Sequence, residues 1–252
     1  MVDCKPLATP VPVSCPVPSS MAPYADPTQY RSLAGALQYL TVTRLDLSFA
    51  VNRICQHMHS LTTEHWVMLK RVLRYVKGTL HFGLFIRLSS SLAVHAFSDS
   101  DWAGDPSDRK STSGFLVFLG GNLISWSCQK QRTVARSSTE AEYKALADVS
   151  AEVTWLVYLL RELGISLAVP PILWCDNLGA TYLCSNPVFH ARTKHVEIDY
   201  HFVCDKVAQK ELQVSFISTK DQLADVFSKA LPGPRFTTLC NKLNVVSSQL
   251  CA

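Results

Sequence analysis

The sequence lacks the marks of membrane insertion and of secretion. No uncharged run reaches the length of about 20 residues that crosses a bilayer, and no basic start precedes a long apolar core. It also lacks any Cys-x-x-Cys pair, although nine of its 252 residues are cysteines. We therefore expect a soluble intracellular protein, cytoplasmic or nuclear, with no zinc site and with reduced core cysteines. The cysteines in apolar surroundings are Cys128, Cys175, Cys184 and Cys204.

Charged residues are scarce as well, at 17%, while hydrophobic residues make up 48% of the chain. This balance is typical of a globular protein and excludes a disordered one. The net charge of +4 permits nucleic-acid binding without demanding it, because local clustering of charge matters more than the total. The length suits one large or two small domains.

Prolines are concentrated at the start of the chain, where residues 1–27 predict a flexible arm, since proline sustains neither helix nor central strand. Residues 28–88 have apolar positions at helical spacing and predict three short helices. Thr62 is a candidate N-cap for the third helix, and Gly78 its end. A domain boundary is expected near the serine-rich segment 87–92, and the segment 233–252 has no strong pattern and is expected to be a tail.

Residues 93–232 alternate between strand and helix patterns and predict a mixed α/β domain. A first strand ends in Asp99, and two further strands flank the hairpin signal Gly120–Gly121. A long amphipathic helix is expected over 137–163, closed by Gly164. The later elements are a strand over 170–176, a helix from 178, a helix over 192–210, a strand over 212–219 and a helix over 220–231.

Four acidic residues stand in four separate segments, in the order Asp, Glu, Asp, Asp. They are Asp99, Glu142, Asp176 and Asp225. Carboxylate oxygens suit hard cations such as Mg²⁺ and Mn²⁺, and two such ions about 4 Å apart can promote phosphodiester cleavage. Any one acid is more often a surface charge or a helix cap. The informative observation is that all four acids occur in this order on the expected elements. If they lie close together, their mutual repulsion favours a bound cation.

Five runs around these acids resemble the ribonuclease H domain of copia-type retrotransposon Pol polyproteins. They are Asp99–Phe115, Ser137–Leu146, Trp174–Ala180, Arg192–Phe202 and Ser218–Leu231. The resemblance spans roughly residues 30–231. Its upstream part resembles the last helical region of the preceding reverse transcriptase, which would make 28–88 a helical remnant of that region. The chain would then be the C-terminal piece of a longer polyprotein.

The resemblance implies a ribonuclease H-like α/β fold over residues 93–232, preceded by a small helical segment. This fold is a mixed five-stranded sheet flanked by helices. Its first and fourth strands are neighbours, which would place Asp99 and Asp176 side by side. Glu142 would point back at them from the first turns of the long helix, and Asp225 would lie near the start of the last helix.

The function implied by the resemblance is a ribonuclease H-type hydrolase that cleaves the RNA strand of RNA–DNA hybrids. Asp99 would bridge two Mg²⁺ or Mn²⁺ ions, Glu142 and Asp176 would hold one of them, and Asp225 the other. All four acids would thus be both catalytic residues and metal ligands. The expected partners are the RNA–DNA hybrid and the remaining reverse transcriptase part of the polyprotein. A membrane is not an expected partner.

Basic and hydroxyl side chains near the acids are expected to contact phosphates, which positions a duplex without reading its sequence. They are Arg109, Lys110, Ser111, Thr112, Lys130, Arg136, Arg192, Lys194 and His195. Ordinary surface polarity stays open as the alternative for each of them.

Several alternatives remain open at the level of sequence. Glu140 is two residues from Glu142 and lies about 200° away around a helix, so the matching frame favours Glu142. Asp101 would share a strand face with Asp99, either behind the metal ligands or in solvent.

The loop before Asp225 has no histidine, unlike that of cellular ribonucleases H, and no Tyr-x-Asp-Asp polymerase motif is present. A catalytically silent retrotransposon relic that folds and binds nucleic acid is the alternative function, and an integrase-like strand transferase would need a different acid pattern.

Overall fold

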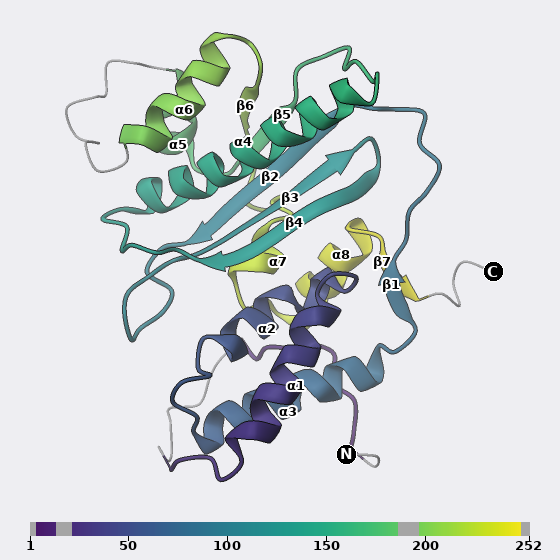
Figure 1. Cartoon of the computed structure of the whole chain (residues 1–252), viewed down its shortest axis with the longest axis vertical. Coiled ribbons are helices and arrows are strands. Elements are labelled where there is room, and N and C mark those ends of the chain that lie inside the picture. Colours follow the sequence, from purple (N-terminus) through teal and green to yellow (C-terminus); the bar gives the residue numbers. More distant parts are fainter. Residues whose placement is uncertain (1–3, 14–21, 186–196, 248–252) are drawn as a thin grey trace. The chain divides into compact units, whose positions relative to one another are not determined.

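The computed structural model describes residues 4–13, 22–185 and 197–247 (Figure 1). The chain divides into two compact units, one of residues 1–85 with 229–252 and one of residues 86–228. Helices dominate the first unit, and the second contains the five-stranded sheet. Across the described residues, every helix is too short or too polar to cross a bilayer.

The first unit contains the three helices expected upstream. They are α1 (Pro27–Leu40), α2 (Ser48–Cys55), which follows a 3-10 turn, η1 (Leu45–Leu47), and α3 (Thr63–Gly78). Helix α3 begins directly after Thr62 and ends at Gly78, as the sequence predicted. The segment expected to be a tail contains helix α8 (Gly233–Lys242) and strand β7 (Val245–Ser247), which pairs with β1 (Phe82–Leu84). Proline in the first turn of α8 suits a helix start, where an N–H is not needed.

The described part of the proline-rich segment lies along α3. Arg74 Nε donates a hydrogen bond to the carbonyl of Lys5 over 2.8 Å, and Lys77 Nζ donates to the carbonyl of Cys4 over 3.0 Å. Arg71 donates to the Thr9 hydroxyl over 3.0 Å. The basic side of α3 therefore holds residues of its own chain in this structure.

The second unit is built on a mixed sheet with the strand order β4-β3-β2-β5-β6. Its strands are β2 (Val94–Asp101), β3 (Thr112–Leu119), β4 (Asn122–Lys130), β5 (Ile172–Cys175) and β6 (Gln213–Phe216). Strands β2, β3 and β4 pair antiparallel through a hairpin whose Gly120 has a φ of 59°, while β5 and β6 run parallel to β2. The expected mixed five-stranded sheet, with its first and fourth strands adjacent, is confirmed.

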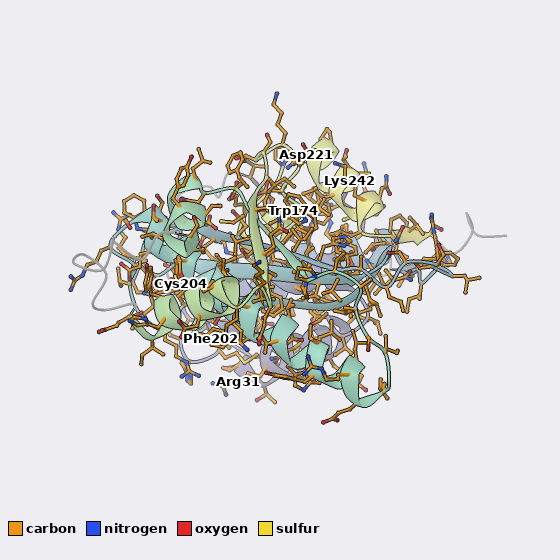
Figure 2. The ribbon with its side chains drawn as sticks, turned by 90° about the horizontal axis from the view of Figure 1, so that it is seen from above. Arg31, Trp174, Phe202, Cys204, Asp221 and Lys242 are labelled. Carbon is orange, nitrogen blue, oxygen red and sulfur yellow. The ribbon has the colours of Figure 1, made fainter. Side chains whose placement is uncertain are left out.

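Three helices pack on one face of this sheet: α4 (Ser138–Glu162), α5 (Leu178–Ser185) and α6 (Glu197–Ala208) (Figure 1). Ala96, Val117 and Leu173 are paired across neighbouring strands and are buried under α4. Figure 2 shows Phe202 and Cys204 on α6, which pack against the same core. Burial of this apolar surface is the main stabilising contribution to the second unit.

The last expected helix is much shorter than predicted. In place of a helix over 220–231 the structure has one turn, α7 (Asp225–Ser228). The fully buried Gln222 explains the difference, because its amide nitrogen donates to the Ser98 carbonyl over 2.9 Å and its amide oxygen accepts from the Ala224 backbone over 3.2 Å. A side chain that bonds the backbone locally competes with helix formation, so the helix begins only at Asp225.

Helix α7 packs on the sheet face opposite α4. Asp99, Gly114 and Cys128 face one another across β2, β3 and β4, three positions along β2 from Ala96, and therefore point to the other face. A side-chain atom added at Gly114 would lie 2.3 Å from Phe227 Cβ, so α7 approaches the strand too closely for any residue but glycine there.

Candidate active site

Three of the four acids converge in the second unit. One carboxylate oxygen from each of Asp99, Glu142 and Asp176 lies within 4.8 Å of the others. Asp99 is fully buried, Glu142 is 6% exposed and Asp176 is half-buried. The group is thus covered on one side and accessible from the side of Asp176.

Parallel pairing of two strands brings the two aspartates together. Ser98 on β2 and Cys175 on β5 are partners in register, so Asp99 and Asp176 follow at the same level of adjacent strands. Glu142 comes from the first turns of α4, and the Ser100 backbone N–H donates to its Oε1 over 3.2 Å. The strand ends and the helix start therefore meet at this group.

Glu140 has a different structural role from Glu142. Its Oε2 accepts a hydrogen bond from the Arg136 backbone N–H over 2.8 Å, and its Oε1 pairs with Lys144 Nζ over 2.7 Å. The Ser137 hydroxyl accepts from the Glu140 N–H, so both side chains close the start of α4. The structure places Glu142, and not Glu140, beside Asp99.

The other two acids considered from the sequence lie near this group but outside it. Asp225 is the first residue of α7 and is 5% exposed, and α7 packs against β2 and β3. Ser228, at the end of the same turn, donates a hydrogen bond to Asp99 Oδ2. Asp101 accepts a hydrogen bond from the Thr112 backbone N–H, so it holds the loop between β2 and β3.

The ligand atoms of the group suit a hard cation. Cys175 directly precedes Asp176 and is fully buried. Burial, followed by the negative charges of Glu142 and Asp176, raises the pKa of the Cys175 thiol well above its usual value. The donor atoms of the group are carboxylate oxygens, which fit Mg²⁺ or Mn²⁺.

The expected phosphate-binding residues of the β2–β3 loop divide into buried and exposed ones. Ser111 is fully buried and its hydroxyl accepts from the Ala103 N–H over 3.0 Å, while Thr112 is 7% exposed. Arg109 is exposed and has a φ of 56°, and Lys110 is half-buried with its Nζ 3.9 Å from Asp108. Arg109 and Lys110 are therefore the cations that this loop offers to solvent.

Lys130 is held by two carboxylates, with Asp108 at 3.0 Å and Asp105 closer still. Burial alone would raise the pKa of Asp105, but hydrogen bonds from Lys130 and Ser107 outweigh it and hold the pKa well below its usual range. Among the other predicted cations, Arg136 is exposed before α4. Arg192, Lys194 and His195 lie outside the described residues.

Sequence reasoning missed three buried polar side chains around the acids. They are Gln131, Gln222 and Ser228. The Gln131 amide nitrogen donates to the Ser113 hydroxyl over 2.7 Å and to the Ala141 carbonyl over 2.9 Å, which ties β3 to the start of α4. Only Ser228 had a signal in the sequence, because it follows Asp225 at the helical spacing of three residues. The Gln131 partners Ser113 and Ala141 and the Gln222 partner Ser98 are ten or more residues away in sequence, so no local pattern predicts these contacts.

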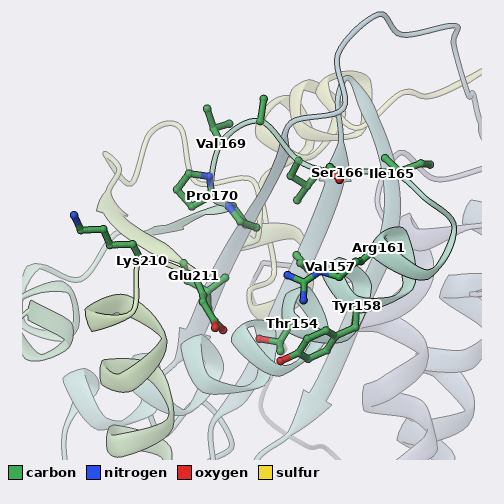
Figure 3. A pocket seen from close by; sticks show the side chains of 14 residues that line it. Thr154, Val157, Tyr158, Arg161, Ile165, Ser166, Val169, Pro170, Lys210 and Glu211 are labelled. Carbon is green, nitrogen blue, oxygen red and sulfur yellow. The ribbon is translucent and has the colours of Figure 1, made fainter.

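A pocket of about 390 Å³ lies in another part of the second unit. It is lined by the C-terminal part of α4, the loop 165–171 and residues 210–212, and the side chains of Thr154, Tyr158 and Arg161 contribute to its wall (Figure 3). These segments precede β5 and β6, whereas Asp99 lies toward the C-terminal end of β2, Asp176 directly follows β5 and Glu142 lies in the first turns of α4. The pocket is therefore separate from the acid group.

We expect Glu140→Gln to lower the free energy of unfolding by about 1 kcal/mol and to leave Mn²⁺ binding unchanged. The amide keeps an acceptor for the Arg136 N–H but loses the ion pair with Lys144. Urea unfolding and calorimetric titration with MnCl₂ would measure the two quantities. A variant that no longer binds Mn²⁺ would show that the helical acid of the site is Glu140.

Comparisons with known proteins give close relatives for nearly the whole chain. The retrovirus-related Pol polyprotein from transposon RE2 of Arabidopsis thaliana is 51% identical over 247 residues, which cover 98% of this chain and 17% of that protein. The corresponding polyprotein from transposon RE1 is 50% identical over 249 residues, which cover 97% and 17%. The chain thus spans about a sixth of the length of these relatives. No protein-family profile matches it.

Among solved structures, LC11-RNase H1 in complex with an RNA/DNA hybrid is similar with a TM-score of 0.42 and 11% sequence identity. The similarity covers 54% of this chain and 93% of that one.

Proposed function

The chain belongs to the Pol polyproteins of copia-type retrotransposons, and we propose that its ribonuclease H-like domain is a metal-dependent endoribonuclease acting on RNA–DNA hybrids. The family assignment comes from about 50% identity to the RE1 and RE2 polyproteins along nearly the whole chain. The chain has the mixed five-stranded sheet of that domain. The reaction, its metal dependence and its substrate are the proposal.

The convergence of Asp99, Glu142 and Asp176 is the observation that carries this proposal. These residues come from β2, α4 and the end of β5, yet one oxygen of each lies within 4.8 Å of the others. Three carboxylates at this distance repel one another, and burial of Asp99 and Glu142 increases the cost of their charge. A divalent cation would offset that cost, which supports a metal site here.

The carboxylates of Asp99, Glu142, Asp176 and Asp225 would hold two Mg²⁺ or Mn²⁺ ions. When bound, such ions activate a water for attack on phosphorus and stabilise the leaving 3′ oxygen. Asp99 lies on the central strand of the sheet and would contact both ions. Asp225, which starts the turn that is bonded to Asp99, would complete the set from the sheet face on which α7 packs.

Exposed cations around the acids would position the phosphates of the hybrid. In the described residues Arg109, Lys110 and Arg136 are accessible for this role, and Arg192, Lys194 and His195 stay predictions. Lys130, Ser111 and Thr112 would support the loop that carries Arg109. Phosphate contacts orient a duplex, and contacts to the 2′-hydroxyls would select its RNA strand.

In the relatives this segment is part of a longer polyprotein. We propose that residues 28–88 are the helical end of the reverse transcriptase and that the remaining reverse transcriptase part is a partner of this chain. The hybrid made during reverse transcription would then be the substrate.

The test is cleavage of an RNA–DNA hybrid with a 5′-labelled RNA strand by the full chain in Mg²⁺ or Mn²⁺. We expect cuts within the RNA strand of the hybrid, none in duplex DNA of the same sequence and none after chelation with EDTA. An intact hybrid under all metal conditions would contradict the proposal. Binding of that hybrid without cleavage, measured by fluorescence anisotropy, would instead support the silent relic.

A further inference from the structure

Helix α7 is fixed to the sheet by contacts on three strands. On β2, the Ser228 hydroxyl bonds to Asp99 Oδ2. On β4, the thiol of Cys128 lies 3.0 Å from the Phe227 carbonyl, and on β3 the absence of a side chain at Gly114 admits Phe227. A single helical turn is unstable by itself, so these contacts determine where the turn lies.

The contact of Ser228 differs from those of Phe227 because its hydroxyl bonds directly to a carboxylate of the acid group. Its side chain is fully buried, as is that of Asp99. A hydroxyl that donates to a carboxylate makes a charge-assisted hydrogen bond, which is stronger than a bond between neutral groups. This bond fixes the plane of the Asp99 carboxylate from the α7 side of the sheet.

Ser228 also links Asp99 to Asp225. Within α7, Asp225 and Ser228 are three positions apart, so they lie on one side of the turn, with about 5–6 Å between their Cβ atoms. The hydrogen bond between Ser228 and Asp99 therefore sets the rotation of the Asp99 carboxylate. It also sets the distance between β2 and the turn that begins with Asp225.

We propose that Ser228 is a positioning residue of the metal site, which orients the Asp99 carboxylate and holds the turn that carries Asp225 against β2. This inference rests on the proposed function, since it assigns Ser228 to the same site. Ser228 acts through the two aspartates and contacts neither the ions nor the hybrid. Partners of this kind typically change metal affinity by about 10- to 100-fold when they are removed.

The test is calorimetric titration of the full chain with MnCl₂, in the wild type and in three variants. We expect Ser228→Ala to weaken Mn²⁺ binding by about 10-fold or more. Ser228→Thr keeps the hydroxyl and should recover affinity to within about threefold of wild type. Ser150→Ala is the matched control, because Ser150 is equally buried but its hydroxyl donates to the Leu146 carbonyl within α4.

Melting temperatures of all four proteins, measured in EDTA, separate positioning from loss of the fold. Wild-type affinity in a folded Ser228→Ala protein would overturn the inference, and so would an equal loss in Ser150→Ala or in a folded Ser228→Thr protein. A wild type that binds no Mn²⁺ would overturn it as well. Hybrid cleavage by the wild type tests the proposed function separately: Mn²⁺ binding without cleavage would contradict that function, while the variants still decide the role of Ser228.

Discussion

Asp99→Asn is expected to reduce cleavage of an RNA–DNA hybrid by about a thousandfold or more, because positioning and metal charge supply nearly all of this chemistry. The amide keeps the shape of the side chain and an acceptor for the Ser228 hydroxyl, but it removes the charge that would contact both ions. Single-turnover cleavage in Mg²⁺ would measure the loss. We expect Mn²⁺ binding to weaken in parallel.

The same substitution should leave the metal-free protein at least as stable as the wild type. Removing one of three carboxylates that lie within 4.8 Å relieves their repulsion. Thermal melting in EDTA measures this effect, and Asp205→Asn on the exposed side of α6 is the matched control for loss of a charge. Cleavage that survives Asp99→Asn would mean that these acids are not the active site.

Asp46→Ala in the first unit is expected to lower the free energy of unfolding by about 3–5 kcal/mol. Arg44 donates to both carboxylate oxygens of Asp46, over 2.9 and 2.7 Å, and the Tyr75 hydroxyl donates to Asp46 over 2.7 Å. All three residues are at most 5% exposed. The substitution would leave the Arg44 guanidinium buried without its counterion, and a buried unpaired charge is costly.

Urea unfolding followed by circular dichroism would measure this loss, with Asp26→Ala as the comparison in the same unit. Asp26 is an exposed N-cap that accepts a hydrogen bond from the Gln29 N–H over 2.9 Å, and its removal should cost only about 1 kcal/mol. An equal loss of unfolding free energy in Asp46→Ala and Asp26→Ala would contradict the prediction that the buried pair of Arg44 and Asp46 stabilises the first unit.

Local sequence signals were sufficient for the elements with strong periodicity or clear end signals. The long helix α4, with Gly164 at its end, and the hairpin around Gly120 follow from such signals, because helix and turn preferences act over a few neighbouring residues. The frame of α4 also favoured Glu142 over Glu140. Resemblance to the family, and not the pattern itself, supplied the strand order that puts β5 beside β2.

The last helix was predicted too long because a contact with a residue distant in sequence competes with helix formation. Residues 220–224 have a helical sequence pattern, but the Gln222 side chain bonds Ser98 on β2 and the backbone next to it, and only one turn remains. The division of the chain also depends on distant pairing, since β7 follows α8 and pairs with β1 in the first unit. No local pattern contains either of these contacts.

The sequence by itself determined which residues can bind a hard cation, since carboxylates are identified by their chemistry and by their order along the chain. Only the tertiary structure decided which of them meet. Parallel pairing of β2 with β5 set Asp99 beside Asp176, and the start of α4 turned Glu142 toward them and Glu140 toward Lys144. The contact of Ser228 with Asp99 was likewise decided by packing, because a hydrogen bond between residues 129 positions apart depends on the folded sheet and not on local preference.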